Sequence, residues 1–468
     1  MGTRNGFPNP PAMGSGGQSP PAPDAIKMTA QRPLGAIHAA ALVVASMVGT
    51  GIFTTTGVLL MSLSSPAVVL AAWAISGVLA LCGAAVYAEL GAMMPRVGGE
   101  YVYVSRAFGP VAGFMSGWVA LIVGFAAPTA GGAIGFASYV NAVVPSLPPK
   151  AVAIALIVAV TALHMTDVRL GGRVQAGLAG LVVAVIVVFV VAAVASGRLS
   201  GANLAATVPA AASAPARGAG ALAAAGAFAI ALVQVSYAYS GWNGAAYVAG
   251  EVRDPVRALP RALVLGTGLV TVLYLALNVV YLCAVPPGAL AGQINVGHIA
   301  AGALFGARGA DVVSSLIALT NAGFVSAMLM SGPRVAVAMG EDGAFFRALG
   351  RSNARGAPTR AVGLQGALAI VAVLTAKYDQ LLVYVGFTLT LNAAAAVLAA
   401  FVLRRREPAD RPHSALGWPY SGVLFVSLAA FMIVLAVRER PWESAAALAT
   451  LIAGGGAYAA WHRRHSRT

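Results

Sequence analysis

The chain alternates long apolar stretches with short polar segments over nearly its whole length. A helix needs about 20 apolar residues to cross a bilayer, and twelve windows reach or approach this length. They cover residues 34–60, 67–92, 108–143, 150–167, 172–197, 220–250, 261–285, 307–340, 360–376, 380–403, 415–436 and 441–461. The pattern therefore predicts an all-α polytopic membrane protein with twelve transmembrane helices.

Two of these windows are interrupted by glycine in their middle. Residues 46–53 read SMVGTGIF in the first window, and residues 237–244 read YAYSGWNG in the sixth. Unsatisfied backbone groups at membrane depth cost several kcal/mol each, so a break persists only where it lines a cavity or a ligand. The alternative is that these glycines only allow close packing between helices. The repetition favours broken helices 1 and 6.

Each break falls in the first helix of a group of five. Because five is odd, the two groups insert with opposite topology, which predicts a five-plus-five inverted repeat. We expect repeats over about 34–197 and 220–403 within a ten-helix core at 34–403, followed by helices 11 and 12 within 404–461. Residues 1–33 are predicted to be a disordered tail and residues 462–468 a short second tail.

Charge distribution predicts the orientation. Charged residues make up only 9% of the chain, against about 25% in soluble proteins. Of the 29 basic residues, 22 fall in segments on the side of the two termini, and the loops of the other side hold only Lys150, Arg198, Arg217, Arg308, Lys377, Arg438 and Arg440. Basic loops stay inside, so both termini are expected in the cytoplasm of a cell that carries this protein in its inner or plasma membrane. The net charge of +15 reflects this topology and not nucleic-acid binding.

The breaks suggest a chemistry. The second half of a broken helix presents free N–H groups and the positive end of its dipole, which can hold a carboxylate. In the first break this half begins at Gly49-Thr50-Gly51, and the Thr50 hydroxyl adds a donor. The first halves end in free carbonyls near Met47 and Tyr237, which can accept from an ammonium group. Together they suit the two backbone groups of an amino acid.

Several motifs carry a family resemblance. They read GTGIF at 49–53, YAEL at 87–90, PRVGGEY at 95–101, YSGWN at 239–243 and EVRDP at 251–255. In this order they resemble the amino acid–polyamine–organocation (APC) transporter superfamily over about residues 34–460, nearest to its L-type amino acid transporter branch. The resemblance implies secondary active transport by alternating access on the inverted-repeat fold.

The resemblance also implies roles for individual residues. Thr50 and Gly51 would bind the substrate carboxylate and the Met47 carbonyl its amino group, while Tyr237 would be an aromatic gate. Ala238 and Ser240 would contribute backbone and Asn243 a polar side chain. Ser240 replaces a residue that is often glycine in the L-type branch. Val182 stands where some relatives place a lysine, which excludes proton coupling through that lysine and leaves a coupling ion (Na⁺ or H⁺), exchange or uniport open.

Other polar residues lie near the ends of the predicted helices. Glu89 and Glu100 flank the end of the second window near Arg96 and Arg106, and are expected to form structural or gating ion pairs at the cytoplasmic boundary. Trp242 is either a gate or a packing residue. Asn278, Asn321 and Asn392 either line the pathway or bridge helices.

With acids only at the boundaries, the predicted pocket is uncharged, which favours neutral amino acids as substrates. The alternatives are a polyamine or organocation porter on the same fold and a membrane sensor without transport. The sequence has no nucleophile elbow and no P-loop, so neither an enzyme nor an ATP-driven pump is expected. Cys82 and Cys283 supply no metal or disulfide framework, no cofactor is expected, and the loop after the third span has no cysteine for a disulfide-linked accessory subunit.

Overall fold

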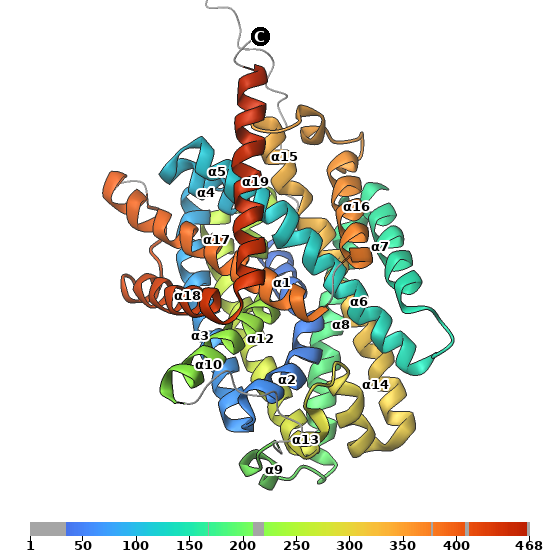
Figure 1. The fold of residues 1–468 in the computed structure, drawn as a ribbon. Coiled ribbons are helices and arrows are strands. Elements are labelled where there is room, and N and C mark those ends of the chain that lie inside the picture. Colours follow the sequence, from blue (N-terminus) through green and yellow to red (C-terminus); the bar gives the residue numbers. More distant parts are fainter. Residues whose placement is uncertain (1–33, 167, 209–219, 376–377, 408–410, 466–468) are drawn as a thin grey trace, which may run out of the picture.

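The computed structural model describes residues 34–166, 168–208, 220–375, 378–407 and 411–465 (Figure 1). These residues form helices and their connections, with a single isolated β-bridge between Leu34 and Val252. The first half contains α1 (Ala36–Met47), α2 (Thr50–Leu63), α3 (Pro66–Met93), α4 (Glu100–Phe108), α5 (Pro110–Val119), the π-helix η1 (Ala120–Ala126), α6 (Ala127–Val143), α7 (Pro149–Thr166) and α8 (Val168–Ala195).

The second half follows the short α9 (Ala202–Ala205). It contains α10 (Ala221–Tyr239), α11 (Gly244–Tyr247), the 3₁₀ turn η3 (Ala249–Glu251), α12 (Pro255–Ala284), α13 (Pro287–Leu290), α14 (Val296–Ser331), α15 (Pro333–Glu341), the 3₁₀ turn η4 (Arg347–Gly350), α16 (Thr359–Thr375) and α17 (Tyr378–Arg406). The last two helices are α18 (Tyr420–Glu439) and α19 (Pro441–His465).

The predicted spans are present as helices. Within the described residues, eleven helical stretches are long and apolar enough to cross a membrane. The twelfth predicted span, 360–376, corresponds to the shorter apolar helix α16. Many side chains on these helices point outward and are apolar, including Val188, Leu265 and Ile452, which are 65%, 67% and 74% exposed. Such a surface is stable in hydrocarbon and unfavourable in water.

The two halves are related by their packing. Four of the five spans of the first half contact the span that stands five later: α2 packs on α10, α3 on α12, α6 on α14 and α7 on α16. This pairing is what an inverted repeat with an axis in the membrane plane produces. It brings the two broken helices together at the centre of the bundle.

Two further spans depart from a regular α-helix. The third widens into η1 just before Pro128, which has no N–H to donate to the preceding turn. The eighth is bent at Gly306, whose φ of 75° lies in the left-handed region. The residues before and after Gly306 therefore form two helices that meet at this kink, close to residue 307, where the eighth predicted window begins.

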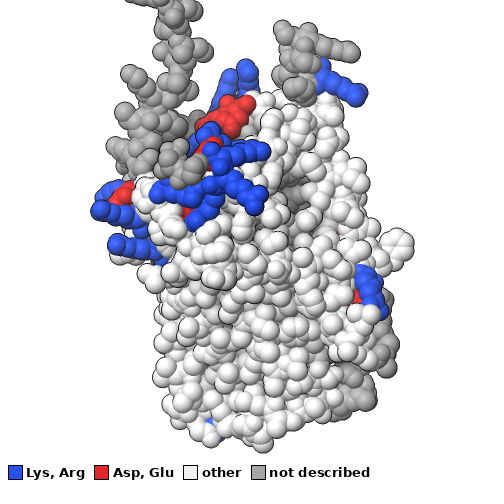
Figure 2. Space-filling view, turned by 90° about the vertical axis from the view of Figure 1, so that its left-hand side faces the viewer, with Lys and Arg blue, Asp and Glu red and all other residues white. Residues whose placement is uncertain are grey.

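Charged side chains gather at one end of the molecule, whereas the lateral surface in the same view is almost free of them (Figure 2). The C-terminal end of α19 lies at this charged end (Figure 1). Leu34, at the start of the described chain, is joined to the segment after η3: its N–H donates to the Glu251 carbonyl at 3.1 Å, and its carbonyl accepts from the Arg253 N–H at 2.7 Å. This bridge ties the beginning of α1 to the end of the second broken helix.

Candidate functional site

The first break separates α1 from α2. Val48 is extended (φ −79°, ψ 93°), Gly49 precedes the first turn of α2, and no side chain caps that turn. The N–H groups at the start of α2 are therefore available to an anion. A Cβ on Gly51 would lie 2.4 Å from the Cα of Ala238, so only glycine permits this approach of the two broken helices.

The second break lies between Tyr239 and Gly244. Ser240 is extended (φ −54°, ψ 143°) and Gly241 has a φ of +98°, which L side chains rarely adopt. A Cβ on Gly241 would also lie 2.3 Å from the Ser46 carbonyl oxygen. The two breaks therefore contact each other through backbone, and glycine is required there for its conformation and for space.

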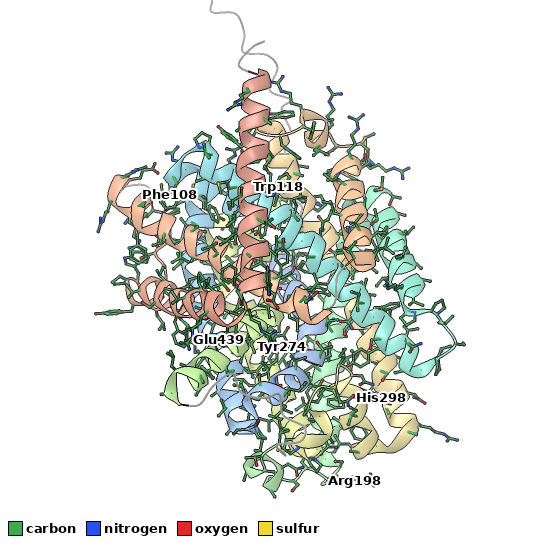
Figure 3. The ribbon with its side chains drawn as sticks, in the orientation of Figure 1. Phe108, Trp118, Arg198, Tyr274, His298 and Glu439 are labelled. Carbon is green, nitrogen blue, oxygen red and sulfur yellow. The ribbon has the colours of Figure 1, made fainter. Side chains whose placement is uncertain are left out.

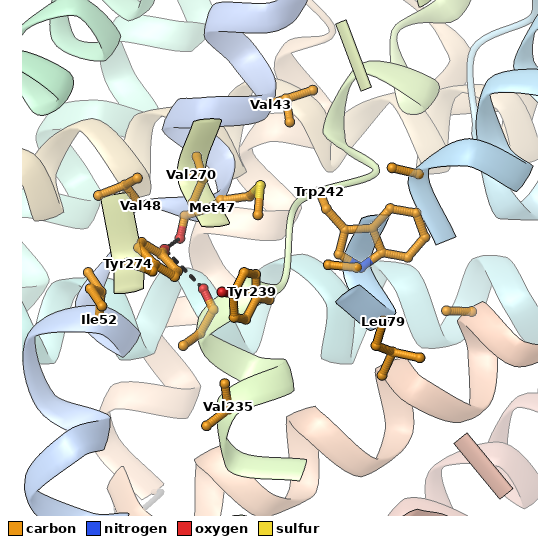
Figure 4. Close-up of a cluster of buried hydrophobic side chains, with 14 of the residues drawn as sticks. Val43, Met47, Val48, Ile52, Leu79, Val235, Tyr239, Trp242, Val270 and Tyr274 are labelled. Atoms are coloured by element: carbon orange, nitrogen blue, oxygen red, sulfur yellow. Dashed lines mark hydrogen bonds between the residues drawn. The ribbon is translucent and has the colours of Figure 1, made fainter. Parts of the chain in front are cut away.

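A tyrosine from a third helix joins the ends of the first half-helices. The Tyr274 hydroxyl, on α12, lies 2.5 Å from the Met47 carbonyl and 3.1 Å from the Ala238 carbonyl (Figure 4). It is fully buried, near the middle of the bundle, with Phe108 toward the charged end and Arg198 at the other (Figure 3). The carbonyl cluster expected from the sequence is present, and here a hydroxyl donates to it.

The predicted site residues fall into two groups. Thr50, Gly51, Met47, Tyr237 and Ala238 are tightly buried. The hydroxyls of Thr50 and Tyr237 lie 3.4 Å apart, and the Thr50 methyl fills the space left by Gly135 of α6.

The second group lines a pocket on the other side of the breaks, toward the charged end. Ser240, Asn243 and Trp242 line it together with Ser46, Ser76, Ser236, Tyr239, Tyr247 and Thr390. Among the described residues, the hydroxyls of Ser46, Ser76 and Ser236 are buried without a hydrogen-bond partner. Buried polar groups without partners destabilise a protein by about 1–3 kcal/mol each, so these hydroxyls suit a polar ligand or water.

Glu100 also lines this pocket, and the ion pair predicted for it is wrong. Its carboxylate is 2% exposed and pairs with neither Arg96 nor Arg106. It accepts hydrogen bonds from the Tyr87 hydroxyl at 2.6 Å, the Tyr247 hydroxyl at 3.0 Å, the Asn243 amide at 2.8 Å and the Asn392 amide. The pocket therefore contains a carboxyl group, and the expectation of an uncharged pocket is corrected.

The remaining predicted ion-pair residues have partners far away in sequence. Glu89 is 1% exposed, bound by Arg404 through both carboxylate oxygens and approached by Arg411 at 3.8 Å. Arg96 pairs with Asp342 at 2.8 Å, and Arg106 with Glu407 at 2.9 Å. Each pair links the α3–α4 region to the second half at the charged end.

Trp242 packs against the Tyr87 ring, with centroids 4.7 Å apart and planes at 70°. It also covers Gly83 of α3, where a Cβ would lie 2.6 Å from the indole.

Asn278 accepts a hydrogen bond from Thr56 and so bridges α12 to α2, whereas Asn392 bridges α17 to Glu100. In the described part of the chain neither side-chain polar atom of Asn321 has a partner.

This arrangement, two broken helices that meet at a polar pocket, is that of a secondary transporter. The amino acid permease family model matches residues 34–455, and the chain belongs to this family. The chain is 28% identical over 430 residues to the b(0,+)-type amino acid transporter 1 of Mus musculus, covering 88% of this chain and 84% of that one. It is 28% identical over 458 residues to the large neutral amino acids transporter small subunit 2 of Homo sapiens, covering 95% and 83%. These relatives are transporters and not enzymes, and they agree with the resemblance to the L-type branch.

Proposed function

We propose that this protein moves neutral amino acids across the cell membrane by alternating access. The observation that carries the proposal is the direct contact of the two helix breaks, with free N–H groups at the start of α2 and clustered carbonyls at the ends of α1 and α10. An α-carboxylate and an α-amino group are the complementary ligands.

In the proposed binding mode the carboxylate contacts the N–H groups at Thr50 and Gly51. The amino group donates to the Met47 and Ala238 carbonyls, taking the place of the Tyr274 hydroxyl. The substrate side chain extends past Tyr237 or toward Ser240 and Asn243. The pocket lies beside the breaks, on the side away from Thr50. The excess of basic residues favours the cytoplasm for the charged end of the molecule.

Glu100 favours a second candidate, a porter of organic cations, because its carboxylate has no basic partner among the described residues. Its four hydrogen bonds already occupy the acceptor positions of the two oxygens, however. A cationic side chain would have to displace one of these donors. The same geometry favours zwitterionic substrates with neutral side chains.

Competition separates the two candidates. The experiment measures uptake of radiolabelled alanine, leucine and phenylalanine into vesicles that contain the purified protein. Other neutral amino acids, arginine, glutamate and putrescine are added as competitors. A side-chain charge at membrane depth costs about 2.5–3.5 kcal/mol, so neutral compounds should compete around a hundredfold better. If arginine or putrescine competes as well as the best neutral compound, the pocket binds cations. If none of the labelled amino acids is taken up, a membrane sensor without transport is the remaining alternative.

A further inference from the structure

Two acids are buried among the described residues, Glu89 and Glu100, and Glu100 differs from Glu89 in having only neutral partners. Its Oε1 accepts from Tyr87 and Asn243, and its Oε2 from Tyr247 and Asn392. We propose that Glu100 is the proton-binding site of this transporter and that one proton crosses the membrane with each substrate molecule. This inference rests on the proposed amino acid transport.

The geometry makes the charge of Glu100 depend on conformation. Burial disfavours an ionised carboxyl, whereas each donated hydrogen bond favours it. Two of the four donors, Asn243 and Tyr247, belong to the second half of the broken sixth helix. When this segment moves away, the carboxylate loses these donors and its protonated form becomes the more stable one.

The fold provides for such a movement. Asn243 and Tyr247 follow Gly241, whose φ of +98° marks the break, and the bridge between Leu34 and Val252 ties the end of their segment to the start of α1. The other two donors lie on α3 and α17, outside the broken helices. If α1 and α11 move as one unit to open the protein toward the cytoplasm, the donors on the moving segment separate from the donors on α3 and α17.

No fixed charge compensates Glu100 in the described structure. The titratable groups that face it are the phenols of Tyr87 on α3, Tyr103 on its own helix and Tyr247 on α11; from α17 the neutral Asn392 reaches it. The nearby arginines Arg96, Arg106 and Arg404 are engaged with Asp342, Glu407 and Glu89. Burial raises the pKa of the Glu100 carboxyl and the four donors act against this rise.

Glu100 is also within reach of the substrate. It shares the pocket with Ser46 and Ser240, which belong to the two breaks. A proton on Glu100 and a substrate at the breaks thus occupy one cavity, and the segment that carries Asn243 contacts both. This shared segment couples the two binding events, because each stabilises a position of the same element.

The test uses vesicles containing purified protein, with the membrane potential held at zero and the neutral amino acid selected by the competition panel. A gradient of one pH unit, acid outside, is worth about 1.4 kcal/mol per proton. Coupling of one proton to each substrate should therefore give an accumulation of about tenfold, whichever way the protein is oriented. Exchange of labelled for unlabelled substrate across the same vesicles is measured in parallel.

The two proposals fail differently. Exchange without accumulation in the pH gradient overturns proton coupling and leaves transport standing, whereas absence of exchange overturns the proposed function and this inference with it. Glu100→Gln should lose the accumulation and exchange equally well at pH 6 and pH 8. Glu443→Gln, at an ion pair with Arg440 at the start of α19, is the matched control and should accumulate substrate as the unmodified protein does.

A second pair of variants tests the donors without removing the acid. Tyr247→Phe and Asn392→Ala each withdraw one hydrogen bond from the ionised carboxyl, so the pH at which exchange is half-maximal should move to a more alkaline value. Unchanged or more acidic midpoints in both variants would contradict the assignment to Glu100, even if Glu100→Gln does not fold.

Discussion

Replacing Gly51 by Val is expected to reduce substrate exchange at least about a hundredfold. A Cβ at this position would lie 2.4 Å from the Cα of Ala238 and 2.5 Å from its Cβ, and a backbone atom cannot turn away as a side chain can. Overpacking typically costs about 1–3 kcal/mol, and about 3 kcal/mol against the substrate-bound arrangement corresponds to roughly a hundredfold. The measurement is the exchange rate in vesicles, normalised to the amount of inserted protein.

A matched control is Gly180→Val on α8, where a Cβ meets nothing within 4 Å. It makes the same substitution in another apolar helix and should exchange within about twofold of the unmodified protein, because no packing is disturbed. If Gly51→Val also retained normal exchange, the glycines of the first break would serve a role other than close contact around the substrate.

Glu89→Gln should have the largest effect on stability, a loss of about 3 kcal/mol. Removing one member of a buried ion pair typically costs about 3–5 kcal/mol because the other charge stays behind without compensation. Here Arg404 and Arg411 would both remain, with side chains only 16% and 19% exposed. The neutral amide could keep the hydrogen bond that Glu89 accepts from the Ala415 N–H at 2.8 Å, which sets the expected loss at the lower end.

Thermal unfolding of the purified protein in detergent measures this loss. The control is again Glu443→Gln, since its pair with Arg440 is exposed at 45% on the arginine side, and such pairs are worth about 0–1 kcal/mol. Equal unfolding temperatures for Glu89→Gln and Glu443→Gln would show that the Glu89 cluster contributes no more than a surface pair.

The breaks could be predicted from the sequence because their cause is local. Glycine at 49, 51 and 241 interrupts an otherwise apolar helix, and helices end within a residue or two of these positions. Span limits were predictable for the same reason: hydropathy and Gly306 or Pro110 mark them directly in the chain. Backbone conformation and burial in lipid depend on a few neighbouring residues.

The partners of the acids could not be predicted in this way. Nearness in sequence suggested Arg96 and Arg106 for Glu89 and Glu100. Glu89 instead binds Arg404, 315 residues later, and Glu100 has no arginine partner in the part of the chain that the structure describes. Glu100 begins α4 and accepts hydrogen bonds from Tyr87 of α3 and Asn392 of α17, and only the packing of these helices brings the three residues together. Tyr274 was missed for the same reason, since a tyrosine in an apolar helix has no distinguishing neighbour in the chain.

The central claim is that the helix breaks hold both backbone groups of an amino acid. The most direct measurement is inhibition of substrate exchange by two analogues of the selected neutral amino acid, its methyl ester and its N-acetyl derivative. The ester has no carboxylate for the N–H groups at Thr50 and Gly51, and the acetyl compound has no ammonium for the Met47 and Ala238 carbonyls. Each lost charged hydrogen-bond set is worth about 1.5–3 kcal/mol, so both analogues should inhibit at least about tenfold more weakly than the parent amino acid. If either analogue inhibited exchange at the same concentration as the parent amino acid, the claim would be contradicted.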